Sequence, residues 1–243
     1  MSGFQEFSFG EGDGGISGRR KRFKAEGGNT YRVSFIWFRG LSEGKVEFGT
    51  EEKPAAPQFN GAQTHFIPNV GYVVNKGPEF TKVAGEAPRA RIGTVIVVWP
   101  TDKNGKLDKS ALAEKGGEVL PWIFSGDKYR SLSQIHEEFP LSFHDVTLAC
   151  TDTTYQKMTF TPCKESLFKT LAENPKAAER VKALIEAAQA IAGDIQGEIG
   201  QELTIEQVRE KMAGGTGGTT GGPTGGAAVS SGDIDGMVDG ILD

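Results

Sequence analysis

Positively charged side chains recur beside aromatic ones along the middle of this chain. Guanidinium and ammonium groups bind phosphates, and flat rings stack on unpaired bases, so this mixture is typical of single-stranded nucleic-acid binding. Each pair of a cation and an aromatic residue is weak evidence alone, because aromatic residues in strands most often belong to a core. Taken together, they predict a DNA-binding groove. Its candidate residues are Arg32, Phe38, Arg39, Tyr72, Lys76, Arg89, Arg91, Lys128, Tyr129, Arg130, Tyr155 and Lys157.

Signals for enzyme chemistry are poor. The sequence contains no phosphate-binding loop, no nucleophile elbow and no HExxH zinc motif. His65, His136 and His144 are scattered, and Cys150 and Cys163 lack the spacing of a closed zinc site. We therefore expect no enzymatic activity, no metal and no cofactor.

The ends of the chain are acidic, whereas its middle is basic. Residues 19–160 contain 20 Lys and Arg against 16 Asp and Glu, although the whole chain has a formal net charge of −5. This small excess does not by itself indicate nucleic-acid binding. The sequence has neither a signal peptide nor an apolar run of about 20 residues, so we expect no membrane contact.

The first 24 residues predict a mobile arm that ends in a basic segment. Arg19, Arg20, Lys21 and Arg22, followed by Lys24, place five cations in six positions. Such a block can contact phosphates or an acidic surface on a neighbouring subunit, or can simply be solvated.

The last thirty residues divide into a tether and a tip. Residues 214–232 are rich in Gly, Thr and Ser, which predicts a flexible linker. The tip is acidic and apolar, and it can dock on a basic-rimmed partner or compete for the chain's own basic groove. Its candidate partner-binding residues are Asp233, Ile234, Asp235, Met237, Val238, Asp239, Ile241, Leu242 and Asp243.

Alternating and apolar patterns predict strands at 30–39, 65–75, 89–99, 119–124, 143–150 and 155–161. In the first strand, one face mixes Arg32, Ser34, Ile36 and Phe38, so we assign that face to the groove. Pro68 and Gly71 interrupt the second strand, and residues 41–62 form a loop. The run at 89–99 is too apolar to be half exposed and predicts a central strand.

Helical spacing predicts helices at 127–139, 164–172, 175–195 and 204–213, and residues 107–115 form a short helix or a loop. The order of elements favours a mainly β protein with C-terminal helices (α+β), built on a small OB-fold-like barrel. We place the nucleic-acid-binding body at 25–162 and a helical region at 163–213.

The same features resemble the single-stranded DNA-binding (helix-destabilising) proteins of T-even phages. The similar stretches are the basic segment, VSFIWF, RARIGTVIVVW, DKYRSLSQI, FTPCKESLF and DIDGMVDGILD. The resemblance implies an OB fold and cooperative, sequence-independent binding of single-stranded DNA in phage replication, recombination and repair. It also implies a tail that recruits replication and recombination proteins, and subunit contacts through Arg19–Arg22. Those proteins have a zinc subdomain with one His and three Cys ligands, which this chain lacks.

Two alternatives stay open. The helical region at 163–213 can instead assemble a phage structural particle, or the body can bind RNA. The leading reading places the protein in the cytoplasm of a bacterial host cell.

Overall fold

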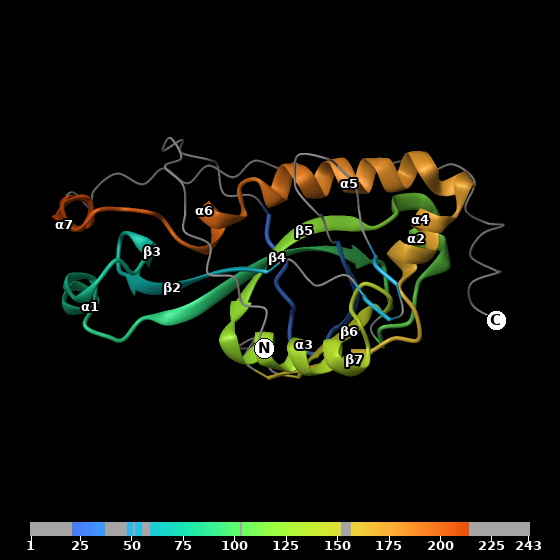
Figure 1. Ribbon diagram of the computed structural model, residues 1–243, viewed down its shortest axis with the longest axis horizontal. Helices are drawn as coiled ribbons and strands as arrows, with labels where there is room; N and C mark the ends of the chain where they lie inside the picture. The colour runs from blue at the N-terminus through green and yellow to red at the C-terminus, as the bar shows by residue number, and fades with distance from the viewer. Residues whose placement is uncertain are drawn as a thin grey trace.

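The computed structural model describes residues 21–36, 48–50, 52–54, 59–102, 104–151 and 157–213 (Figure 1). The predicted site residues Arg19, Arg20, Phe38, Arg39 and Tyr155, together with the linker and the tip, lie outside these ranges.

One antiparallel sheet organises the part of the chain that the structure describes. Its seven strands are β1 (Thr30–Phe35), β2 (Asn60–Ile67), β3 (Gly71–Val74), β4 (Arg89–Trp99), β5 (Glu118–Ser125), β6 (Val146–Cys150) and β7 (Met158–Pro162). Strand β4 is central, because β5 pairs along one edge and the other edge is shared by β2 and then β1. Strands β6 and β7 continue from β1, and β3 continues from β2.

The sheet is open, so the described strands do not close into the small barrel expected from the sequence. Separate segments cover two of its edges instead of joining one edge to the other. The backbone N–H of Phe23 donates to the carbonyl of Pro121 on β5 (2.9 Å), and Gln201 forms a parallel bridge with Val73 on β3. As predicted, the strand containing Pro121 lies at an edge, where proline removes no ladder hydrogen bond.

Helices cover both faces of the sheet (Figure 1). The helices are α1 (Pro78–Ala84), α2 (Lys109–Lys115), α3 (Gly126–Glu138), α4 (Leu167–Glu173), α5 (Ala178–Ala192), α6 (Ile195–Ile199) and α7 (Ile205–Ala213), with a 3-10 turn at Pro175–Ala177. Helices α4, α5 and α6 bury one face against Val95, Val97 and Trp99 of β4. Helix α3 packs on the other face, over Trp122 and Phe124 of β5. The predicted α+β class is confirmed.

A small lobe with its own core projects from this body. It consists of α1, β2, β3 and α7, which lie together at the left end of the molecule in Figure 1. Its core contains Ile67, Val73, Phe80 and Val208. Helix α7 begins at the capping box predicted from the sequence, since Thr204 and Gln207 exchange hydrogen bonds of 2.8 and 3.3 Å.

Several element predictions need correction. Residues 60–62, expected in a loop, begin β2, and the interrupted strand at 65–75 is a β2–β3 hairpin. Helix α1 was missed, although Pro78 at its first turn and left-handed Gly85 at its end are typical helix boundaries. None of the described helices combines the length and apolarity needed to cross a bilayer.

Candidate nucleic-acid interface

Two exposed aromatic rings lie side by side on the lobe. Phe66 and Tyr72 are directly opposite each other on β2 and β3, with side chains 50% and 42% exposed. Their ring centroids are 5.2 Å apart at 61°, an edge contact. The neighbours His65, Ile67 and Val73 point to the opposite face, where they are buried. Strand alternation puts both aromatic rings on the other face, which is buried further along at Thr64 and Val74 and open to solvent at the rings.

Arg91 completes this arrangement from β4. Its guanidinium carbon lies 3.5 Å from the centroid of the Tyr72 ring, a cation–π contact. Ala62 is the direct partner of Arg91 on the intervening strand β2, and its small side chain leaves room for the arginine to reach β3. Burial lowers the pKa of Arg91 to about 10, so the group stays protonated at neutral pH. We call Phe66, Tyr72 and Arg91 the platform.

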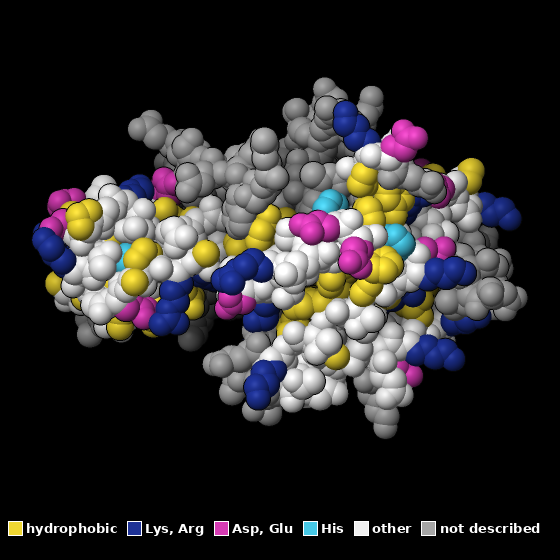
Figure 2. Space-filling model, turned by 60° about the horizontal axis from the view of Figure 1, so that its bottom comes forward, with side chains coloured by type: hydrophobic (Ala, Val, Ile, Leu, Met, Phe, Trp, Pro, Cys, Tyr) yellow, Lys and Arg dark blue, Asp and Glu magenta, His cyan; other side chains and the backbone are white. Residues whose placement is uncertain are grey.

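Two further cations lie on the strands of the platform or just past them, since Arg89 on β4 is opposite Thr64 and Lys76 follows the end of β3. Lys76 lies 3.5 Å from Glu202 and Arg89 lies 3.0 Å from Glu86, all partly or fully exposed. Exposed pairs of this kind are weak, so either cation can exchange its carboxylate for a phosphate. Figure 2 shows Lys and Arg interspersed with Asp and Glu on the lobe surface, which forms the left end of that view.

A second arginine reaches the same side of the sheet from the N-terminal segment. Arg22 forms an ion pair with Glu198 of α6, whose side chain is only 7% exposed. Arg91 donates to the carbonyl oxygen of Ile199, the next residue of α6. The end of α6 is therefore held between two guanidinium groups.

The groove predicted on strand 30–39 is wrong for the described part of that strand. Ser34 and Ile36 on the chosen face are buried, at 0% and 2% exposed. The Nε of Arg32 donates to Oδ2 of buried Asp145 at 2.7 Å, and Asp145 also accepts from Ser34 and from the backbone N–H of Leu167 at the start of α4. Helix α4 covers this face. Arg32, the charged residue that suggested a groove, instead holds Asp145 against the start of α4.

The candidates on α3 and β7 lie away from the platform. Tyr129 packs its ring edge against Phe59 (5.4 Å) at the rim of the core, and Arg130 pairs with Asp127 on the surface at 2.8 Å. Lys128 is half-buried, and Lys157 is exposed just before β7. The structure thus brings Tyr72 and Arg91 together, with Lys76 and Arg89 nearby, but it does not bring α3 or β7 to them.

The predicted mobile arm ends earlier than expected. Phe23 is 6% exposed and packs edge-on against Trp122, with ring centroids 5.8 Å apart. Of the four residues predicted to contact another subunit, Lys21 lies 2.6 Å from Glu118 and Arg22 is paired with Glu198. Both are therefore engaged within the chain.

Two residues of the site were missed by sequence reasoning. Phe66 sits in an apolar stretch, HFIPNV, and only the hairpin register across Pro68 and Asn69 reveals that it faces Tyr72. Glu198 carries no sequence signal, because an acid on a short helix is usually solvated.

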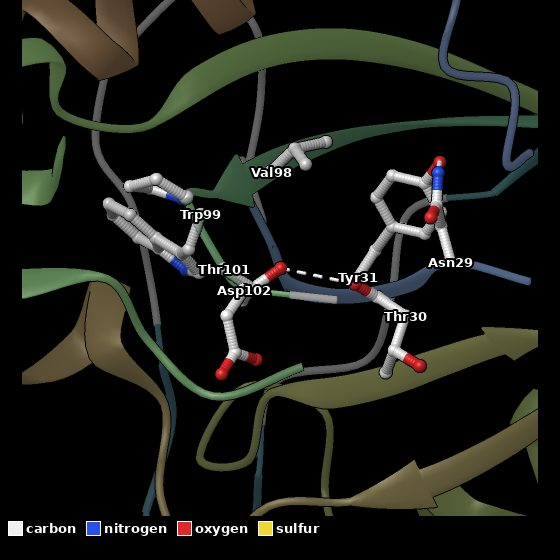
Figure 3. A pocket seen from close by; sticks show the side chains of 8 residues that line it. Asn29, Thr30, Tyr31, Val98, Trp99, Thr101 and Asp102 are labelled. Carbon is white, nitrogen blue, oxygen red and sulfur yellow. Dashed lines mark hydrogen bonds between the residues drawn. The ribbon is translucent and has the colours of Figure 1, made fainter. Parts of the chain in front are cut away.

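An open pocket lies elsewhere, where the start of β1 meets the end of β4. Its volume is about 360 Å³ and its lining includes Tyr31, Trp99 and Asp102 (Figure 3). The hydroxyl of Thr101 donates to the carbonyl of Thr30 at 3.1 Å, and the Tyr31 hydroxyl accepts from the N–H of Glu26 at 3.0 Å. These polar groups hold the ends of the strands together. Among the described residues, no three His, Cys, Asp or Glu side chains are grouped so as to hold a metal ion.

Comparison of the chain with protein families, with characterised proteins and with solved structures gives no match. The resemblance to T-even phage proteins therefore stays a prediction, and we infer the function from the site itself.

Proposed function

We propose that this protein binds single-stranded DNA without sequence preference, through the platform on its lobe. The observation that carries the proposal is the cross-strand pair Phe66 and Tyr72, exposed beside the Arg91 guanidinium. Half of the Phe66 ring contributes nothing to the core because it lies in solvent, whereas a stacked base gains about 1–3 kcal/mol on such a ring. Stacking uses the π-face that every base has, so the binding is tolerant of sequence.

The body is compatible with an OB-like architecture, which we keep as part of this proposal. Strands β5, β4, β1, β6 and β7 pair in that order, and α3 contacts β5 and β7 across the open side. The OB fold is a five-stranded, partly open barrel that binds oligonucleotides. Roles in phage replication, recombination and repair, partner recruitment by the tip at 233–243, self-association on DNA and a location in the host cytoplasm belong to the same proposal.

The alternative of a particle-forming protein is less well supported. It needs an apolar helical surface that is free for assembly. The apolar stripe of α5 is used within the chain, since Val181, Leu184 and Ala188 are buried against the sheet.

A titration tests the proposal. A fluorescent oligo(dT) is titrated with the full chain at two salt concentrations, beside a duplex of equal length and a matched oligo(U). We expect binding of the single strand that weakens with salt, by about 0.7 in log–log slope for each phosphate neutralised, and weaker binding of the duplex. Tighter binding of oligo(U) than of oligo(dT) would favour an RNA function, and the absence of binding at low salt would contradict the proposal.

A further inference from the structure

Among the described residues, Arg22 and the platform residue Arg91 lie beside one carboxylate, that of Glu198. Arg22 is paired with Glu198, and both lie near enough to Arg91 to affect its protonation. The other partner of Arg91 is a neutral carbonyl, that of Ile199. Within the part of the chain that the structure describes, two guanidinium groups and one carboxylate leave one positive charge uncompensated.

This excess charge is partly removed from water. Glu198 is 7% exposed and the side chain of Arg22 is 35% exposed, so the cluster sits at the edge of the fold. Charges in such a setting attract an anion more strongly than fully solvated ones do, because the surrounding protein screens them less. Each guanidinium has five N–H donors, and the hydrogen bonds described above use only some of them.

The charge is also in the right place for a nucleotide. The Arg91 guanidinium touches the Tyr72 ring, and Phe66 presents its own ring next to Tyr72. A base stacked on the rings therefore brings its own backbone towards Arg91. Arginine binds phosphate oxygens with two parallel N–H donors, which a lysine cannot do.

We propose that Arg22, Glu198 and Arg91 form a phosphate subsite for the nucleic-acid backbone, in which Glu198 acts as a built-in competing anion. The subsite deepens the proposed function and rests on it. The bound phosphodiester neutralises the positive charge that Glu198 leaves uncompensated. Because Glu198 is also an anion, it lowers the affinity of the two arginines for the phosphodiester. Weakening of this kind suits a protein that must leave DNA as well as bind it.

The experiment compares two variants that each remove one carboxylate. Glu198→Gln removes the competing anion, and Glu118→Gln is the matched control, because it releases Lys21 of the same N-terminal segment from its ion pair. Both variants raise the net charge by one. Binding of oligo(dT) and of an abasic oligonucleotide is measured as a function of salt.

We expect Glu198→Gln to tighten binding of both oligomers about three- to tenfold at low salt and to steepen the salt slope by up to about 0.7. Glu118→Gln should change binding less than twofold. If a folded Glu198→Gln variant binds no more tightly than wild type, Glu198 is only a structural anchor and the inference fails, while wild-type binding keeps the proposed function intact. If wild type binds no oligomer, both fail.

Two further measurements guard against a misfolded variant and a different ligand. Arg22→Gln removes one of the two positive charges and should lower the salt slope by about 0.7. An unchanged slope would overturn the inference, even if Glu198→Gln does not fold. Inorganic phosphate is added as a competitor against chloride at equal ionic strength. Displacement of the oligomer by phosphate would support the subsite, because free phosphate and the backbone present the same oxygens to the two guanidinium groups. Phosphate binding that leaves the oligomer bound would overturn the assignment to the backbone.

Discussion

Replacing Phe66 with alanine separates binding from folding. The ring is 50% exposed, and its buried part contacts Tyr72 across the hairpin. Full burial of a Phe side chain stabilises a protein by about 1.5–3 kcal/mol, so loss of this half-buried ring should lower the free energy of unfolding by only about 1 kcal/mol. Loss of one stacking surface should cost about 1–3 kcal/mol of binding, which is roughly a 5- to 150-fold rise in Kd for oligo(dT).

Phe139→Ala is the matched control for this variant. Phe139 follows α3, is 40% exposed and makes one edge contact, with the ring of His144 at 5.6 Å. Both variants should lose similar stability in a denaturant titration, but only Phe66→Ala should weaken DNA binding. Because neither change removes a charge, the salt slope should stay at the wild-type value. Wild-type affinity in a folded Phe66→Ala protein, or an equal loss in Phe139→Ala, would refute the reasoning.

Three other perturbations have expected outcomes. Asp145→Ala leaves the Arg32 guanidinium, 13% exposed, without its carboxylate, and should lower the free energy of unfolding by about 3–5 kcal/mol in a denaturant titration; a loss below 1 kcal/mol would contradict the anchoring role. Burial lowers the pKa of His136 from its ordinary 6.5, and its Nδ1 accepts from the N–H of Leu141 (3.1 Å), so the unfolded state binds the proton first. Stability should therefore be full above about pH 6.5 and fall as the pH drops, and His136→Gln should reduce that dependence, as thermal melts at several pH values can check. Deletion of residues 214–243 removes four aspartate carboxylates and should tighten oligo(dT) binding at low salt. Unchanged affinity would show that the tip does not compete with DNA.

Sequence patterns predicted the elements with the strongest burial signals. The run at 89–99 is apolar on both faces, so it had to be central, and β4 has those same bounds. The boundary of α7 followed from a capping box, which is a local interaction. Such features depend on a few neighbouring residues, and they are readable without the rest of the chain.

Features that depend on distant partners were not readable. The Arg32 face of β1 looked like a groove because nothing local shows that α4, more than 130 residues later, covers it. Phe23 looked like part of a mobile arm because its partner Trp122 is nearly 100 residues away. Tyr72 and Arg91 were predicted separately, and only the β2–β3–β4 register brings them into contact and adds Phe66.

The most direct test of the account is to find where single-stranded DNA touches the protein. The full chain is cross-linked to oligo(dT) by ultraviolet light, digested with trypsin and analysed by mass spectrometry. We predict that the main cross-linked peptide is the one ending at Lys76, which contains Phe66 and Tyr72, and that Phe66→Ala reduces its yield. Cross-links confined to α3 or to the β6–β7 hairpin would contradict the platform as the binding site.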